Sequence, residues 1–322
     1  MGSVRWGLLS TAGINRRLIP AIRASKRGEL AAVASRSQAG AEVYAEEWGI
    51  PLSFGSYEAM LASDSIDAVY ISLPNHLHAE WTIRALESGK HVLCEKPFAI
   101  TLDEVDRMKA AAENAARVLA EAFMYRHHPQ TKIVGEWVRD GRIGEVTVIN
   151  GVFNFKLENL DNVRLVEDWG GGSLWDVGVY PLSFAQYLMG EMPKVVTGSQ
   201  RLGPSGVDEV FSGLLHYSGD RMALISSSFA SPFYTSFEVI GTEGRLSLNR
   251  PFIGIAEEGE LIFHPPDGEA ERITIPEKEL YLCEIEDMHA AILDGQPSYV
   301  ALEESRKHVQ TVLALYESAR LG

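Results

Sequence analysis

The first 120 residues alternate between short apolar runs and longer segments with helical spacing, and no other feature constrains the fold as strongly. The apolar runs are predicted strands: Val4–Leu9, Leu30–Ala34, Ala68–Ser72, His91–Cys94 and Val118–Glu121. The segments between them are predicted helices: Ile14–Ala24, Gln38–Trp48, His76–Ser88 and Leu102–Ala115. Continuously apolar strands are typical of a sheet covered on both faces. The alternation therefore predicts a doubly wound parallel sheet, a Rossmann domain.

The pattern changes after about residue 122. Val146–Lys156 alternates as a half-buried strand does, and the chain from Val195 to about Ile275 consists of strand-like runs joined by Gly-containing turns. This pattern predicts an antiparallel meander. Helices are predicted at Gln130–Arg139, Leu174–Met189, Glu284–Leu293 and Leu302–Arg320. Because 322 residues are about twice a typical domain, we expect domains at 1–122 and 123–322, with the final helices packing back on the first.

Charge and cysteine content exclude several classes of protein. The net charge of −15 opposes binding to phosphate backbones and anionic lipid, so neither nucleic acid nor a membrane is an expected partner. Two cysteines cannot build a disulfide framework and favour a reduced compartment. No apolar run approaches 18 residues, and the first residues lack the features of a secretory signal. We expect a cytoplasmic protein, with a mature periplasmic form as the alternative.

The turn after the first strand is a candidate phosphate-binding turn. A dinucleotide fold needs small residues there, because the backbone approaches the pyrophosphate closely at a helix N-terminus. Ser10 and Ala12 stand where the first two glycines of the usual GxGxxG motif would be, and both are small. The candidate cofactor-binding residues of this turn are Ser10, Thr11, Ala12, Gly13 and Ile14. An ordinary tight turn between strand and helix is the alternative.

The end of the second strand indicates which dinucleotide is bound. NAD sites usually place Asp or Glu there, to bond the ribose 2′-hydroxyl. This chain has Ser35, Arg36 and Ser37. Hydroxyls and a guanidinium favour a 2′-phosphate, which an acid would repel. We therefore expect NADP(H) rather than NAD(H), the alternative being a solvated loop arginine.

Five segments carry a resemblance to a known family. They are Leu73–His78, Cys94–Pro97, Glu121–Pro129, Gly170–Asp176 and Asp176–Tyr180. With the opening turn they resemble the glucose–fructose oxidoreductase, inositol dehydrogenase and rhizopine-catabolism (Gfo/Idh/MocA) family over essentially the whole chain. The branch they resemble holds glucose–fructose oxidoreductase, xylose dehydrogenases, dihydrodiol dehydrogenases and anhydrofructose reductases.

The resemblance implies an architecture and a mode of assembly. Members carry a Rossmann domain followed by an α/β domain with a large open-faced, mostly antiparallel sheet. That sheet often serves oligomerisation, so we expect a homodimer or homotetramer through it. The implied partner is a small sugar or diol.

The same resemblance implies catalytic residues. Lys96, at the end of a strand, is implied to bond both the cofactor ribose and the reacting hydroxyl. Many members have His at the position of Tyr180; the branch above uses Tyr, so Tyr180 is the expected proton donor or acceptor, with Lys96 as the other candidate base. Asp176 is the expected substrate or relay carboxylate. Glu95 is expected to orient Lys96 or bond the ribose, and Pro97 to follow a cis peptide bond.

Further candidates surround these residues. On the cofactor side we expect Tyr57, Leu73, Pro74, Asn75, His78, Glu95, Lys96, Arg126 and Arg164. On the substrate side we expect Tyr125, Lys156, Asn162 and Trp169, beside Asp176 and Tyr180. The histidine pairs 76/78 and 127/128 have no Cys or acidic partner at ligand spacing, so no metal is expected.

These residues predict an NADP(H)-dependent oxidoreductase that transfers hydride between nicotinamide and a sugar. It would oxidise an aldose at C1 to the lactone, reduce a ketose or dicarbonyl sugar, or couple both as glucose–fructose oxidoreductase does. Alternatives are a dihydrodiol dehydrogenase acting on a non-sugar diol and a non-catalytic sugar- or nucleotide-sensing regulator. An NAD-dependent glycosidase would want NAD, so Ser35 and Arg36 count against it.

Overall fold

The computed structural model describes residues 2–253 and 259–321. The chain forms two compact units, Met1–His127 with Glu279–Arg306 and His128–Lys278 with Lys307–Gly322. We refer to them as the first and the second unit. The segment Glu279–Arg306 thus belongs to the first unit, although it follows most of the second unit in the chain.

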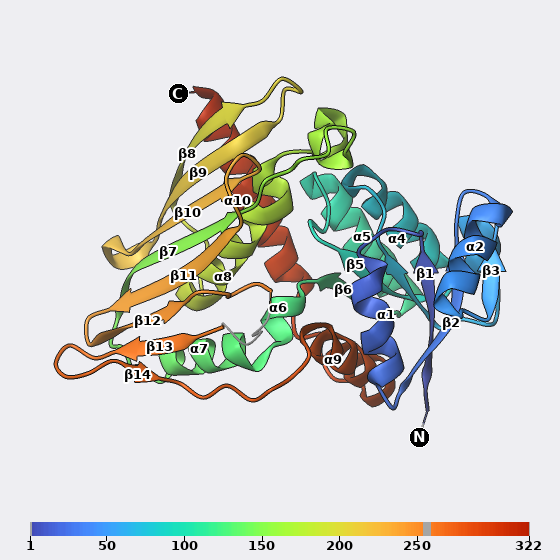
Figure 1. Cartoon of the computed structure of the whole chain (residues 1–322), viewed down its shortest axis with the longest axis horizontal. Helices are drawn as coiled ribbons and strands as arrows, with labels where there is room; N and C mark the ends of the chain where they lie inside the picture. Colours follow the sequence, from blue (N-terminus) through green and yellow to red (C-terminus); the bar gives the residue numbers. More distant parts are fainter. Residues whose placement is uncertain (1, 254–258, 322) are drawn as a thin grey trace. The chain divides into compact units, whose positions relative to one another are not determined.

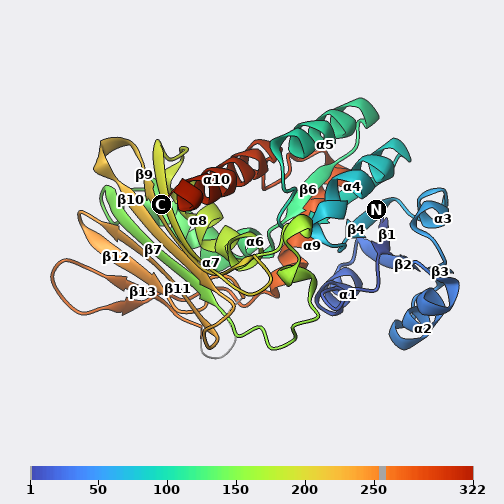
Figure 2. The same cartoon turned by 90° about the horizontal axis from the view of Figure 1, so that it is seen from above.

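The first unit contains a six-stranded sheet whose paired strands are all parallel, in the order β3-β2-β1-β4-β5-β6. The strands are β1 (Val4–Leu9), β2 (Gly28–Ala34), β3 (Leu52–Phe54), β4 (Ala68–Ile71), β5 (His91–Glu95) and β6 (Leu119–Ala122). The helices are α1 (Asn15–Ala24), α2 (Gln38–Trp48), α3 (Tyr57–Leu61), α4 (His78–Glu87), α5 (Leu102–Ala115), α6 (Met124–His127) and α9 (Leu280–Asp294). Figure 2 shows α4 and α5 on one face and α1, α2 and α9 on the other. The predicted doubly wound sheet is confirmed.

Local sequence explains where these helices begin. Ser37 accepts a hydrogen bond from the Gly40 N–H at the start of α2. Thr101 and Glu104 form a capping box at the start of α5. Such side chains satisfy backbone donors that a helix end leaves without intrahelical partners.

The strand order changes direction at one edge of this sheet. β1 lies between β2 and β4, and Leu9 pairs with both Ala34 and Ile71. The connections leave β1 and β4 toward opposite faces, which makes this the topological switch point where ligands bind in such sheets. Residues that follow β1, β2 and β4 therefore meet at one edge.

The second unit is built on an eight-stranded sheet in the order β14-β13-β12-β11-β7-β10-β9-β8 (Figure 1). The strands are β7 (Val146–Asn154), β8 (Val195–Leu202), β9 (Asp208–His216), β10 (Met222–Ser228), β11 (Tyr234–Gly241), β12 (Gly244–Leu248), β13 (Leu261–His264) and β14 (Glu271–Arg272). β7 is parallel to β10, and every other pairing is antiparallel. The predicted mostly antiparallel sheet is confirmed.

Helices line one face of the second sheet. They are α7 (Pro129–Arg139), α8 (Val179–Met189) and the part of α10 (Leu302–Leu321) that belongs to this unit. Figure 2 shows them along one side of the strands, and the described residues place no helix on the other side. Gly151 in β7 permits close packing, since a Cβ there would lie 2.6 Å from the Pro181 Cβ of α8. Within the described chain, every helix is too short or too polar to span a bilayer.

Candidate cofactor and catalytic site

The turn after β1 has the backbone conformation that glycine usually supplies. Ser10 has φ of 150°, a conformation that costs an L-residue about 1–3 kcal/mol. Its side chain is held in place: the Ala12 N–H donates to Ser10 Oγ at 3.1 Å, and Ser10 Oγ lies 2.8 Å from Ser72 Oγ. Gly13 borders open space, since a Cβ there would meet no atom within 4 Å. The small, open turn fits a pyrophosphate at the start of α1.

The end of β2 carries no acidic side chain. Ser35 is half-buried, while Arg36 and Ser37 are exposed. Tyr57 lies nearby: burial raises the pKa of its phenol, and the Arg36 charge partly opposes this shift. The Tyr57 ring packs edge-on against Trp81, with 4.9 Å between ring centroids. The end of β2 thus presents a cation, hydroxyls and an aromatic ring, groups that suit the adenosine 2′-phosphate end of NADP.

His78 fastens the ends of β4 and β5 to each other. Its Nε2 lies 2.8 Å from the Leu73 carbonyl oxygen and its Nδ1 2.8 Å from that of Pro97. The ring is fully buried, and burial lowers its pKa. Each ring nitrogen thus lies against a backbone carbonyl oxygen. His78 therefore holds the loops after β4 and β5 together instead of pointing toward a ligand. Pro74 and Asn75 lie in the first of these loops, at the start of a short 3₁₀ turn.

Glu95 is the last residue of β5, and Lys96 follows it at the same edge of the sheet. Tyr70, fully buried in β4, donates its hydroxyl proton to Glu95 Oε1. The Lys96 N–H donates to Glu95 Oε2 at 3.2 Å, which fixes the Glu95 carboxylate on two sides. Lys96 itself is half-buried. The predicted cis bond is confirmed at Lys96–Pro97.

Tyr125 and Arg126 lie on α6 and are both buried. Arg126 Nη2 donates to Glu304 Oε2 at 2.9 Å, and Arg126 is 1% exposed. A buried guanidinium requires such a partner. The expected cofactor contact of Arg126 stays a prediction.

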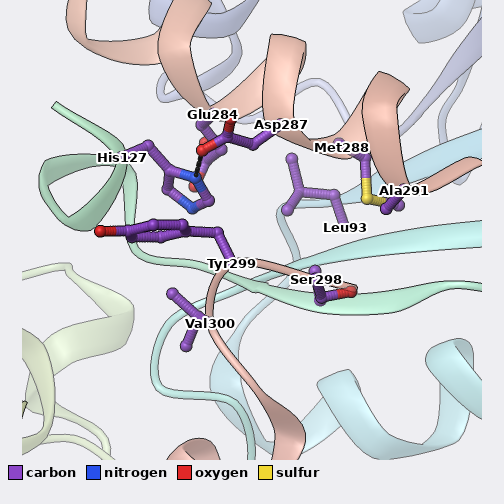
Figure 3. A pocket seen from close by; sticks show the side chains of 10 residues that line it. Leu93, His127, Glu284, Asp287, Met288, Ala291, Ser298, Tyr299 and Val300 are labelled. Carbon is purple, nitrogen blue, oxygen red and sulfur yellow. Dashed lines mark hydrogen bonds and ion pairs between the residues drawn. The ribbon is translucent and has the colours of Figure 1, made fainter. Parts of the chain in front are cut away.

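A small, mostly apolar cavity lies beneath α9 (Figure 3). Leu93 and Ala120 in the interior of the sheet form its floor, and His127 and Glu284 also line it. His127 Nδ1 lies 2.8 Å from Asp287 Oδ2. Because its floor is mid-strand, this cavity is separate from the strand ends where the candidate cofactor residues lie.

The candidate catalytic residues of the second unit lie on an unusual helical turn. Leu174–Gly178 forms a π-helical turn that contains Asp176, and α8 follows directly with Tyr180 in its first turn. Such turns occur often at functional sites. The Tyr180 ring is buried against Phe153 and Phe252, at centroid distances of 5.3 and 5.6 Å.

Arg164 lies beside Asp176. Its Nε donates to Asp176 Oδ2 at 2.6 Å, and the Arg164 N–H donates to Asn162 Oδ1 at 3.1 Å. The structure places Arg164 beside the candidate substrate carboxylate, and its expected cofactor contact stays a prediction. Trp169, in the same connection, is 38% exposed. Lys156 is exposed and 3.6 Å from Glu158.

The glycine-rich segment before the π turn is required by close packing. A Cβ on Gly171 would lie 2.6 Å from the Arg164 carbonyl oxygen, and one on Gly172 would lie 2.0 Å from Asp208 Oδ1. Asp208 is buried and accepts hydrogen bonds from Ser173 Oγ and the Leu174 N–H, at 2.7 and 2.9 Å. These contacts fix the turn that presents Asp176.

The predicted residues thus fall into two groups, one in each unit. In the first unit, the candidate residues lie at or just after the ends of adjacent strands: Ser10–Ile14, Ser35–Ser37, Leu73–Asn75 and Glu95–Lys96. Asn162, Arg164 and Asp176 gather in the second unit. Asn15 and Ser72 hold the Ser10 turn through hydrogen bonds, and neither was predicted. The available signal was Asn15 itself, a polar residue at the third glycine position of the motif. The described residues contain no cluster of three His, Cys, Asp or Glu side chains that could hold a metal.

The parallel sheet, its strand order and the turn after β1 define a dinucleotide-binding protein. Residues 4–123 match the model of the Gfo/Idh/MocA oxidoreductase family with an NAD-binding Rossmann fold, and residues 131–247 match the C-terminal domain of the same family. The chain belongs to the Gfo/Idh/MocA oxidoreductase family.

Similar proteins cover the chain from end to end. D-xylose 1-dehydrogenase (NADP(+)) 2 of Haloferax volcanii is 40% identical over 98% of both chains. A 3-ketoreductase from Actinomadura kijaniata, solved with NADP and TDP-benzene, superposes with a TM-score of 0.92 at 31% identity over 98% of both chains. An aldose-aldose oxidoreductase from Caulobacter crescentus, solved with glycerol, has a TM-score of 0.92 at 26% identity, covering 99% of this chain and 98% of that one.

Proposed function

We propose that the protein is an NADP⁺-dependent dehydrogenase that oxidises a cyclic aldose at C1 to the lactone. The observation that carries the proposal is the full-length similarity to an NADP-dependent D-xylose 1-dehydrogenase, together with a β2 end that bears Ser35, Arg36 and Ser37 and no acid. Reduction of a ketose or dicarbonyl sugar is the same chemistry in reverse, and a cofactor that stays bound would couple the two.

The preference for NADP rests on charge. A 2′-phosphate carries about two negative charges and binds a guanidinium in charge-assisted pairs, each contributing about 1.5–3 kcal/mol. The 3-ketoreductase from Actinomadura kijaniata was solved with NADP. We propose that the Arg36 guanidinium binds this phosphate. The Ser35 hydroxyl and the backbone amides at the start of α2, beside Ser37, would donate further hydrogen bonds to it.

The chemistry of C1 oxidation assigns roles to this chain's residues. When bound, the nicotinamide of NADP⁺ would supply the acceptor for the hydride that leaves C1. The C1 hydroxyl must lose its proton as the lactone carbonyl forms, and we propose that the Tyr180 phenolate accepts it. Lys96 donates a hydrogen bond to the reacting oxygen and stabilises the negative charge there. In the reverse direction, Tyr180 returns the proton and the alcohol forms again.

Two observations support these assignments. The 3-ketoreductase from Actinomadura kijaniata has been solved with one lysine replaced by alanine or glutamate and with one tyrosine replaced by phenylalanine. That lysine and tyrosine are as many positions apart as Lys96 and Tyr180. In this chain the Tyr180 ring packs against two phenylalanines, and its backbone lies in the first turn of α8. Both features hold the position of the Tyr180 hydroxyl.

Arg164 and Asp176 are proposed to bind sugar hydroxyls. Asp176 accepts from Arg164 Nε through Oδ2, and the guanidinium is about two-fifths exposed. A carboxylate and a guanidinium held side by side offer one acceptor and several donors. Vicinal hydroxyls of an aldopyranose match that pattern, because each can donate to one group and accept from the other.

The proposal is tested by measuring NADPH formation from NADP⁺ with D-xylose, D-glucose, D-arabinose and a trans-dihydrodiol as substrates. The product of each active aldose is then analysed for the lactone. We expect turnover with at least one aldose and none with the diol. Tyr180→Phe keeps the ring packing and should lower kcat by about 10²–10⁴ with little change in Tm. The matched control is Tyr187→Phe on the same helix, whose hydroxyl accepts from Arg139 Nη1 at 3.0 Å. Oxidation of the diol alone, or full activity of Tyr180→Phe, would contradict the proposal.

We further propose that the second unit assembles into a homodimer or homotetramer through the sheet face that lies opposite α8. Aliphatic side chains are exposed on its strands, Val195 at 59% and Leu224 at 45%. Uncovered apolar sheet surface is typical of protein interfaces. Sedimentation equilibrium tests this directly: a monomer at micromolar concentration would contradict it.

A further inference from the structure

We infer that Asn15 and Ser72 hold the turn after β1 in the shape that a dinucleotide needs, and so replace the glycines of the usual motif. The inference rests on the proposed NADP-binding function and deepens it. It assigns positioning roles to two buried side chains that need not touch the cofactor.

The motif positions are occupied in an unusual way. In G-x-G-x-x-G the glycines stand at positions one, three and six, which here are Ser10, Ala12 and Asn15. Ser10 nevertheless adopts φ of 150°, as a glycine would. A residue persists in such a conformation only where its surroundings over-determine it. Some contact must therefore hold Ser10.

A closed ring of hydrogen bonds provides that contact. Asn15 Nδ2 donates to the Ser10 carbonyl oxygen at 2.8 Å, and Ser72 Oγ donates to Asn15 Oδ1 at 2.7 Å. With its proton committed to Asn15, Ser72 Oγ accepts from Ser10 Oγ at 2.8 Å. Ser10 Oγ in turn accepts from the Ala12 N–H at 3.1 Å. Ser10 Oγ also donates to the Ser72 carbonyl oxygen at 3.2 Å, so both acceptors of its proton belong to Ser72. The ring fixes both the side chain and the carbonyl of Ser10.

The location of the ring links it to cofactor binding. Asn15 is fully buried, and Ser10 and Ser72 are 8% and 7% exposed. Ser10 follows β1 and Ser72 follows β4, the two strands on either side of the switch point. The ring therefore links the segments that follow β1 and β4 and fixes the direction of the amides that follow Ser10. Those amides, at the start of α1, are the groups that bond a pyrophosphate.

A double-mutant cycle on NADPH binding tests the inference. Asn15→Leu keeps a similar volume without charge but removes both the donor to the Ser10 carbonyl oxygen and the acceptor for Ser72, and Asn15→Ala removes the side chain beyond Cβ. We expect each to weaken NADPH binding by about 5- to 150-fold, on the scale of the strain that the ring offsets. Ser10→Gly alone should change Kd by less than about threefold, because glycine needs no support at this φ.

The decisive variant combines the changes. In the Ser10→Gly background, Asn15→Ala should cost less than about threefold in Kd, since the turn no longer needs to be held. A merely structural role of Asn15 would give the same loss in both backgrounds, and that additive result overturns the inference while the proposed function stands. A wild-type protein that binds neither NADPH nor NADH overturns both. Unfolding midpoints measured on the same variants separate loss of the fold from loss of the turn.

Discussion

Replacing Asp208 by alanine should destabilise the second unit and disorganise the turn that carries Asp176. Asp208 accepts from Ser173 Oγ, the Leu174 N–H and the Tyr316 hydroxyl, at 2.7, 2.9 and 2.6 Å. Ser173 keeps a second partner in Ser227, 2.9 Å away, but the buried Leu174 N–H loses its acceptor. One orphaned buried donor costs about 1–3 kcal/mol, and bonds to a charged acceptor contribute about 1.5–3 kcal/mol each.

An opposing effect reduces that sum. Burial raises the pKa of Asp208, so removing the carboxylate also removes a desolvation cost. We expect a net loss of about 2–4 kcal/mol, which lowers Tm by roughly 5–15 °C for a unit of this size. Asp208→Asn should cost only about 1 kcal/mol, because its oxygen can serve Leu174 and Ser173 while its amide donates to the Tyr316 oxygen.

Urea unfolding measures the predicted loss of stability. Tryptophan fluorescence can follow it, because the ring of Trp175 lies 6.0 Å from that of Tyr316, a partner of Asp208. Asp267→Asn, an exposed aspartate of the same unit, is the matched control and should change nothing. The aldose KM and kcat of Asp208→Ala should worsen, while NADPH binding to the first unit stays as in the wild type. Equal stability of Asp208→Ala and the wild type would contradict a structural role of the carboxylate, as would an Asn variant as unstable as the Ala variant.

Three further predictions concern the first unit. Arg36→Ala should weaken NADPH binding by about 10–100-fold and leave NADH binding unchanged in calorimetric titrations; equal losses for both would remove the 2′-phosphate role. Burial raises the pKa of Glu284, so the folded protein holds a proton that the unfolded chain releases above about pH 4.5, and stability falls as pH rises. Glu284→Gln should be increasingly more stable than the wild type between pH 5 and 8 in urea titrations, whereas parallel curves would count against a buried neutral acid. Burial lowers the pKa of His289 to about 4, and Trp6 Nε1 donates to its Nε2 at 2.9 Å, so the stability it contributes is lost as pH falls from about 6.5 toward 4. His289→Gln should flatten that acid loss in the same titrations; an unchanged acid slope would show that His289 does not titrate there.

The sequence predicted the architecture well because periodicity is a local property. Strands such as Val4–Leu9 and helices such as Leu102–Ala115 were predicted with the same bounds that the structure has. The short edge strand β3 was not predicted, since three residues carry too little pattern. The central place of β7, parallel to β10, also has no local signature, because strand pairing is set by the packing of the whole unit.

The site was harder to predict because side-chain partners depend on tertiary contacts. The Lys96 segment and Ser35–Ser37 are predicted from motif position alone, and their roles stay predictions. The contact of Arg164 with Asp176 was not predicted, because Asp176 lies twelve residues on, across a turn whose close packing requires Gly171 and Gly172. The π turn at Asp176 is not encoded by spacing, since a four-residue separation suggests an ordinary helix. Asn15 was not predicted, because its partners Ser10 and Ser72 are brought to it by the fold, Ser72 from 57 positions away.

The most direct test of the account is the ratio of kcat/KM for NADP⁺ to that for NAD⁺ with D-xylose as the sugar, followed by reduced-nicotinamide absorbance. A ratio well above ten, falling toward one in Arg36→Ala, is the predicted result. Hydride transfer from the aldose to NAD⁺ at an equal or greater rate, or no transfer to either nucleotide while both bind, would contradict an NADP⁺-dependent aldose dehydrogenase.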